Sequence, residues 1–367
     1  MPPRSIIIDC DPGQDDALAI LLALGSPEEL EVLAVTAVAG NVPLALTEQN
    51  ARKVIELAGR PDLPVHRGCA RPLVRALVTA EFVHGRTGLD GAELPEPRMP
   101  PAPAHAVDAI IGILRAEPAG TVTLCPVGPL TNIATALQKA PDVVPRIREI
   151  VLMGGAIGEG NITPAAEFNI YVDPHAADLV LRSGVPIVML GLDVTHQALV
   201  TPERLAAIRR LDTSLSRAVV GLLEFYNLYD QTRRGRVGAP LHDPCAIAYL
   251  LRPELFTGRP CHVAIETRGE HTLGRTVVDW SGRTGKAPTA MVIDGVDADG
   301  FFAMLTERLA RLPLPGRPRP GAGERRTKGA LSTNEAASWP RPSAAGRRGT
   351  PGEATENGGP PARRGLP

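Results

Sequence analysis

The chain has 367 residues, of which 44% are hydrophobic and 22% are charged, and its formal net charge is −1 at pH 7. This composition is typical of a soluble globular protein with one large α/β domain or two smaller ones. A net charge near zero gives no reason to expect nucleic acid or an anionic membrane as a partner. The longest apolar stretch is too short for a membrane-spanning helix. The five cysteines form no CxxC pair, and their odd number argues against a disulfide framework, so we expect a cytoplasmic protein.

Short β-rich apolar runs alternate with helical patterns through residues 1–312. We expect strands over 6–8, 30–36, 122–125, 149–153 and 186–190. We expect helices near 15–24, 44–58, 105–116, 130–138, 175–183 and 202–210. This alternation predicts an α/β fold with a single open, mostly parallel sheet that is covered by helices on both faces.

The composition changes at residue 313. Residues 313–367 are rich in Pro, Gly, Lys and Arg and carry few large apolar side chains. Such a segment cannot bury enough surface to offset the entropy lost on ordering. We therefore expect a folded domain over 1–312 and a disordered tail over 313–367, with no catalytic residue in the tail.

Four aspartates lie close together at the start of the chain: Asp9, Asp11, Asp15 and Asp16. Two carboxylates about 4 Å apart repel by roughly 4 kcal/mol near a protein surface, so the cluster requires protonation or a cation. The run follows an apolar strand and opens a helix, which predicts that all four carboxylates meet where open α/β sheets bind ligands. A metal or phosphate site fits this pattern, and calcium or magnesium is the simplest occupant. The alternative is that one or two of the aspartates only cap the helix.

Two further polar segments carry candidate residues. Asp243 fits the N-cap of a helix that begins at Pro244, and His242 before it is able to supply a proton near neutral pH. In the segment 161–173, Glu167 and Asn169 offer the paired hydrogen bonding that sugar hydroxyls need. Each segment taken alone is also compatible with an ordinary helix start or a polar loop.

Together these segments resemble the nucleoside hydrolases of the inosine–uridine-preferring type, over about residues 6–309. The motifs that carry the resemblance are, in chain order, Asp9-Cys10-Asp11-Pro12-Gly13-Gln14-Asp15-Asp16, Ala39-Gly40-Asn41, Gly128-Pro129-Leu130-Thr131-Asn132, Met153-Gly154-Gly155-Ala156, Glu167-Phe168-Asn169 and His242-Asp243-Pro244. The resemblance implies the nucleoside hydrolase fold over 1–312. It also implies hydrolysis of the N-glycosidic bond of uridine, cytidine or inosine to ribose and free base, in nucleoside salvage, by a homodimer or homotetramer.

The resemblance also implies roles for individual residues. Asp11, Asp16 and Asp243 resemble the carboxylate ligands of a calcium ion, and the main-chain carbonyl of Val127 completes the protein ligands. Asp11 resembles the general base that takes a proton from calcium-bound water, and His242 resembles the acid that protonates the leaving base. The implied substrate-binding residues are Asp15, Asn41, His84, Met153, Asn161, Glu167, Asn169, Tyr226 and Tyr229. His84 matches a mobile loop over the nucleobase, in which Thr87 replaces the family's usual acid.

Two other functions stay open from the sequence. A strand followed by Asp-x-Asp also begins magnesium-dependent phosphatases of the haloacid-dehalogenase type. In those enzymes the second Asp is normally followed by x-Thr or x-Val, whereas Pro12-Gly13 follows here. The second alternative is a non-catalytic sensor of nucleosides or ribose on the same fold. Asp11 and His242 argue against a sensor, because a binding protein has no need of a base.

Overall fold

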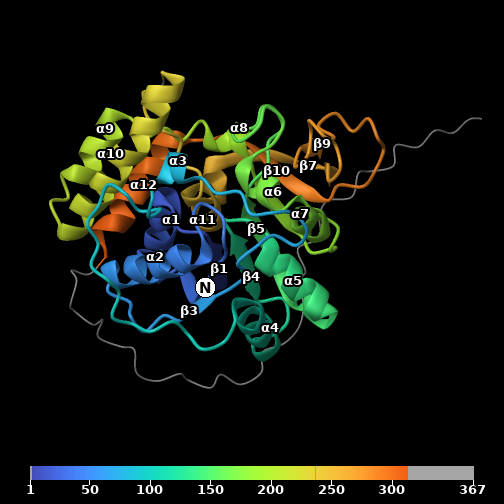
Figure 1. Cartoon of the computed structure of the whole chain (residues 1–367), viewed down its shortest axis with the longest axis horizontal. Coiled ribbons are helices and arrows are strands. Elements are labelled where there is room, and N and C mark those ends of the chain that lie inside the picture. Colours follow the sequence, from blue (N-terminus) through green and yellow to red (C-terminus); the bar gives the residue numbers. More distant parts are fainter. Residues whose placement is uncertain (1, 236, 313–367) are drawn as a thin grey trace, which may run out of the picture. The chain divides into compact units, whose positions relative to one another are not determined.

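The computed structural model describes residues 2–235 and 237–312. Within them, eight strands form one sheet in the order β3-β2-β1-β4-β5-β6-β10-β7 (Figure 1). Their bounds are Val65–Arg67 (β3), Leu30–Ala37 (β2), Arg4–Cys10 (β1), Val122–Pro126 (β4), Ile147–Met153 (β5), Ile187–Leu190 (β6), Ala290–Val296 (β10) and Phe256–Cys261 (β7). All neighbours pair in parallel except β7, which is antiparallel to β10. The chain order reverses between β1 and β4, and ligands of open α/β sheets bind beyond the carboxyl ends of strands at such a point.

Helices cover both faces of this sheet, as predicted (Figure 1). One layer contains α1 (Gln14–Leu24), α2 (Leu44–Leu57), α9 (Pro202–Arg209), α10 (Ser214–Arg234), α11 (Pro244–Leu251) and α12 (Ala298–Ala310). The other contains α4 (Ala106–Ala116), α5 (Thr131–Lys139) and α7 (Pro174–Leu181). In β1, Ile6 and Ile8 pack in the first layer and Ile7 packs in the second. The isoleucine run is therefore buried on both sides, because successive side chains of a strand point to opposite faces.

Short elements complete the fold. Three short helices are α3 (Glu81–His84), α6 (Phe168–Val172) and α8 (Leu192–Thr195), and 3₁₀ turns span Pro141–Arg146 and Pro253–Leu255. The strands β8 (Val263–Ile265) and β9 (Thr276–Val278) form a separate antiparallel pair. Each of the three short helices ends or begins with a residue of the site described below.

The five strands and six helices expected from the sequence are all present, with boundaries within about two residues. The prediction of an α/β fold with a mostly parallel, doubly covered sheet is confirmed. The strands β3, β7, β8, β9 and β10 and the helices α10 and α12 were not expected. Strand β7 lies at an edge of the sheet and its four central residues are exposed, so it lacks the apolar run that identifies a buried strand.

The predicted disordered tail over 313–367 lies outside the described residues. The elements from β1 to α12 span residues 4–310, and the bounds 1–312 of the folded domain stay a prediction. In the described part of the chain, we find no helix with both the length and the apolar character that a membrane crossing requires.

Candidate active site

The first turn of α1 brings two aspartates to the carboxyl end of β1. Asp16 occupies the third helical position, and its carboxylate accepts hydrogen bonds from the main-chain N–H groups of Gly13 at 2.9 Å and Asp11 at 3.1 Å. Asp16 thus satisfies N–H groups that the start of a helix otherwise leaves without partners. Asp15 is buried beside it in the same turn, where the helix dipole favours negative charge.

Asp243 reaches the same place from α11. It precedes Pro244 at the expected N-cap position, but its side chain makes no capping hydrogen bond. One carboxylate oxygen from each of Asp15, Asp16 and Asp243 lies within 4.8 Å of the other two, and all three residues are buried. Two segments more than 200 residues apart in the sequence therefore build one acidic cluster.

Asp11 lies at the side of this cluster between two glycine loops. Its Oδ2 accepts a hydrogen bond from the main-chain N–H of Asn41 at 2.7 Å. Its Oδ1 is buried without a hydrogen-bond partner in the described residues. A Cβ atom on Gly40 would lie 2.0 Å from Oδ2, and one on Gly128 would lie 2.4 Å from Oδ1. The loops after β2 and β4 therefore approach Asp11 so closely that only glycine fits at these positions.

The expected convergence of all four N-terminal aspartates is wrong for Asp9. Its carboxylate accepts hydrogen bonds from the Thr36 hydroxyl and, at 2.8 Å, from the Asn132 amide. The strand ends at Cys10, so Asp9 lies within the sheet whereas Asp11 belongs to the turn beyond it. The alternation of side chains holds only inside a strand, and it does not carry over into that turn.

The clustered carboxyl groups titrate abnormally when no cation is bound. Burial, reinforced by the charge of Asp16, raises the pKa of Asp15 from its ordinary value of 3.8 to about 8. Burial raises the pKa of Asp16 to about 6. Burial and the neighbouring carboxylates hold the pKa values of Asp11 and Asp243 well above the usual range. Burial thus disfavours the charged form at every one of these positions.

The cluster fits a hard cation. The donors are carboxylate oxygens, which calcium and magnesium prefer, and the Oδ1 atoms of Asp11 and Asp15 are buried without partners in the described chain. No Lys or Arg is among the described residues that line the adjoining pocket. The Val127 carbonyl accepts a hydrogen bond from the Asn169 amide at 2.8 Å, and a carbonyl oxygen has a second lone pair to offer.

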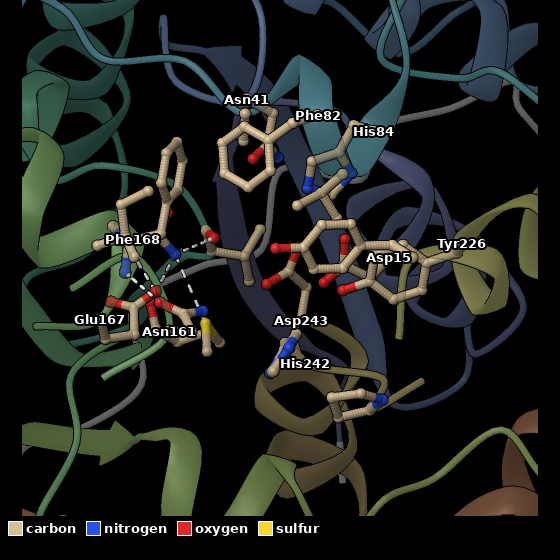
Figure 2. Close-up of a pocket in the computed structure, with 18 residues that line it drawn as sticks. Asp15, Asn41, Phe82, His84, Asn161, Glu167, Phe168, Tyr226, His242 and Asp243 are labelled. Atoms are coloured by element: carbon tan, nitrogen blue, oxygen red, sulfur yellow. Dashed lines mark hydrogen bonds between the residues drawn. The ribbon is translucent and has the colours of Figure 1, made fainter. Parts of the chain in front are cut away.

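The cluster lies at one side of a pocket (Figure 2). Asp15 and Asp243 face it next to each other, with His84 and Tyr226 on one side, while Asn161, Glu167 and Phe168 form the opposite wall. The pocket is lined by Asp15, Asn41, Ala80, Phe82, Val83, His84, Val127, Met153, Asn161, Ile162, Glu167, Phe168, Asn169, Tyr226, Tyr229, Pro240, His242 and Asp243. All nine expected substrate-binding residues are among them. Asp11 and Asp16 are not among the lining residues, and the Asp16 carboxylate accepts a hydrogen bond from the N–H of Asp11.

The wall opposite the cluster is built from the start of α6. Glu167 is its N-cap, and its carboxylate accepts from the main-chain N–H groups of Gly155 and Asn169, both at 2.9 Å. Burial nevertheless raises the pKa of Glu167 to about 7. The amide of Asn169 donates to the carbonyls of Val127 and Met153, and Asn161 accepts from the N–H of Phe168. These contacts fix the polar side chains of the wall in place.

Aromatic rings close the side formed by α3 and α10. The His84 and Tyr226 rings stack with centroids 5.6 Å apart, and Phe82 and Tyr229 lie 5.8 Å apart. Burial lowers the pKa of His84 to about 3. His84 is therefore neutral at physiological pH.

His242 lies between the acidic cluster and α8. Its Nδ1 is 2.7 Å from the hydroxyl oxygen of Thr195, which is fully buried at the end of that helix. The His196 ring lies 5.7 Å from the His242 ring. The contact with Thr195 engages Nδ1 of the imidazole, and His242 lines the pocket.

Several lining residues were not expected from the sequence. Phe82 and Phe168 lie within or beside motifs that had been identified, but neither had been given a role. Ile162 lies next to Asn161, and Pro240 lies two residues before His242. Adjacency to the motifs was the available signal for all four. Thr195 had no such signal, because only the fold brings α8 next to α11.

The comparisons with known proteins agree on a family. The sequence model described as inosine-uridine preferring nucleoside hydrolase matches residues 6–303. An uncharacterized protein of Schizosaccharomyces pombe is 52% identical over 84% of this chain and 99% of its own length. The pyrimidine-specific ribonucleoside hydrolase RihA of Shewanella woodyi is 51% identical over 83% of this chain and 98% of its own.

The solved structures are consistent with this result. A purine-preferring ribonucleoside hydrolase from Gardnerella vaginalis superimposes with a TM-score of 0.79 at 36% identity, covering 84% of this chain and 99% of that one. The residues 6–303 that the family model matches include all residues of the pocket and of the acidic cluster. The chain therefore belongs to the family of inosine–uridine preferring nucleoside hydrolases.

Proposed function

We propose that this nucleoside hydrolase acts on pyrimidine ribonucleosides, uridine and cytidine ahead of inosine, with a calcium ion held in the acidic cluster. The observation that carries the proposal is the pocket itself. It places buried carboxylates opposite a wall of fixed amide and carboxylate groups, with a histidine at its edge. Cleavage of an N-glycosidic bond to ribose and free base needs each of these parts.

The base preference is supported by the relatives. The RihA proteins named as pyrimidine-specific are 50–51% identical to this chain, whereas the purine-preferring enzyme from Gardnerella vaginalis is 36% identical. If the base preference follows sequence identity, this chain prefers pyrimidine nucleosides. Inosine remains a poorer substrate under this proposal.

For the metal, we propose the carboxylates of Asp11, Asp16 and Asp243 and the carbonyl of Val127 as ligands. Asp15, which lies in the same cluster, is proposed to bind the sugar. When bound, calcium would offset the charge of the buried carboxylates and orient the attacking water. The raised pKa values of the cluster support a cation, because proximity to a positive charge returns such groups to their charged form.

The proposed chemistry follows from where the side chains lie. Asp11 takes a proton from the attacking water, using the carboxylate that Asn41 and the glycine loops hold in place. Bond cleavage gives the ribose ring oxocarbenium character, and Asp15, Asn41, Asn161, Glu167 and Asn169 bind its hydroxyl groups. His242 donates a proton to the departing base. Water that attacks the face opposite the base inverts the anomeric centre.

We also propose a cytoplasmic homodimer or homotetramer that serves nucleoside salvage. The five cysteines are free and four of them are buried, which suits a reducing compartment. The family resemblance supports the oligomer.

The test of the base preference is a comparison of kcat/KM for uridine, cytidine, inosine and adenosine. We expect the two pyrimidines to exceed inosine by about tenfold or more. An equal or higher value for inosine or adenosine would contradict the preference while leaving hydrolysis itself intact. No ribose release from any of the four by a folded protein would favour a sensor.

A further inference from the structure

Gln14 begins α1 in the middle of the acidic run, and the chemistry proposed above does not use it. Its side chain is fully buried. The amide nitrogen donates to the main-chain carbonyl of His84 at 3.0 Å and to that of Asp90 at 3.1 Å. The amide oxygen lies 2.7 Å from Nδ1 of the His84 ring. One side chain therefore joins the helix of the acidic cluster to the loop that carries His84.

These contacts fix which nitrogen of His84 carries the proton. The two carbonyl groups only accept hydrogen bonds, so the Gln14 nitrogen must face them and the Gln14 oxygen must face the ring. The oxygen also only accepts, so Nδ1 of His84 must be the donor. In a neutral imidazole with a proton on Nδ1, the other nitrogen, Nε2, is an acceptor.

The position of the ring decides where that acceptor lies. A Cβ atom on Gly13 would lie 2.3 Å from Nδ1 and 2.7 Å from Cε1 of His84, so the Nδ1 side of the ring rests against the acidic loop. The ring lines the pocket and stacks on Tyr226 (Figure 2). Nε2 is therefore the polar ring atom on the side away from Gly13 and Gln14.

Asn50 of α2 holds the same loop without touching the ring. Its amide nitrogen donates to the carbonyl of Thr87 at 2.8 Å and to that of Pro12 at 3.1 Å. Both Gln14 and Asn50 thus attach the loop to the acidic run, but only Gln14 contacts the His84 imidazole. Asn50 is a natural control for the loss of loop anchoring alone.

We propose that Gln14 is a positioning residue that holds His84 as the Nδ1–H tautomer, so that Nε2 accepts a hydrogen bond from an N–H or O–H group of the bound nucleoside. The part of this proposal that concerns substrate rests on the function proposed above. His84 and His242 then have opposite roles in the pocket. His84 selects a substrate that offers a donor, while His242 supplies a proton to the leaving base.

The first experiment reads the tautomer directly and needs no turnover. Two-bond ¹H–¹⁵N correlation spectra of the full chain distinguish Nδ1–H from Nε2–H imidazoles, and the His84→Gln variant assigns the His84 signals among the eight histidines. We expect the Nδ1–H pattern in the wild type and in Asn50→Leu, and its loss in Gln14→Met. A wild-type ring in the Nε2–H form, or an unchanged pattern in Gln14→Met, would overturn the proposal.

The second experiment asks whether Gln14 acts through His84. We expect Gln14→Met to lower kcat/KM for uridine by about three- to tenfold, the value of one or two hydrogen bonds. In a His84→Ala background the same change should have an effect within about twofold, because the two residues act as one unit. The same three- to tenfold loss of kcat/KM in the His84→Ala background would refute the positioning role. Calorimetric titration with calcium should give the same affinity for Gln14→Met and wild type, which separates this effect from damage to the metal site.

Discussion

At the scale of single residues, three aspartates of one short run make different contacts. Asp16 caps its own helix, Asp11 lies between two glycine loops, and Asp9 is bonded into the sheet. Asp16 is held by main-chain groups of its own run, whereas Asp11 and Asp9 are held by residues from other segments, so their contacts set them apart.

Asp11→Asn should lower kcat for uridine by about 10²–10⁴-fold, because the amide has no basic oxygen to take a proton from water. The change keeps an acceptor for the N–H of Asn41, so the fold should survive. The matched control is Asp9→Asn, which keeps an acceptor for Thr36 and Asn132 and should cost no more than about tenfold. Steady-state kinetics on both variants make the comparison, and similar losses would contradict a special role for Asp11.

His242→Ala should affect substrates according to their leaving group. Uridine needs a proton on its departing base and should lose about 10²–10⁴-fold in kcat. The p-nitrophenyl riboside leaves as a stable anion and should lose far less. The two substrates are measured on the same variant, which removes any difference in folding. Equal losses on both would remove His242 from leaving-group protonation.

At the scale of elements, the sequence predicted the residues that line the pocket more completely than it predicted the strands and helices. Apolar runs mark the buried strands, and clustered acids mark the start of α1. The glycines beside Asp11 lie in recognisable motifs. The edge strand β7 has no such pattern, and three-residue strands such as β3 and β9 are too short to show one. Thr195 and Gln14 contact site histidines through tertiary packing, which no spacing within one segment reports. Motifs in the sequence therefore predict candidate site residues, but not the side chains that hold them in place.

The loop after β4 approaches Asp11 so closely at Gly128 that a larger side chain there should displace the carboxylate. Gly128→Ala should lower kcat/KM by about tenfold or more, because the new methyl group would lie 2.4 Å from the Asp11 carboxylate and displace it. Gly112 of α4 has open space around its Cβ position. Gly112→Ala should therefore keep full activity and raise the free energy of unfolding by about 0.5–1 kcal/mol. Kinetics and denaturant unfolding test both, and a fully active Gly128→Ala enzyme would contradict the described packing.

At the scale of the whole molecule, the buried carboxyl groups link stability to pH and metal. In the calcium-free protein, burial raises the pKa of Asp15 to about 8 and the pKa of Asp16 to about 6, compared with 3.8 when unfolded. Between pH 4 and 8 the folded chain thus holds protons that the unfolded chain has released. The free energy of unfolding must then fall as pH rises through this window.

Thermal unfolding at pH 5 and pH 8 tests this linkage. We expect Tm of the calcium-free protein to be lower at pH 8 than at pH 5. Saturating calcium should raise Tm more at pH 8, because ligands that are already deprotonated bind the ion without releasing protons. A calcium-free Tm that rises with pH, or a calcium effect of equal size at both values, would contradict a buried cation site in the acidic cluster.

We propose that this protein uses its acidic cluster and pocket to release ribose from a nucleoside with the help of calcium. The most direct measurement is ribose release from uridine by the full chain, with and without a calcium chelator, followed by addition of excess calcium. We expect release that the chelator abolishes and calcium restores. Release that persists in full with the chelator would contradict the metal site, and a folded, calcium-loaded protein that releases no ribose would contradict the proposed function.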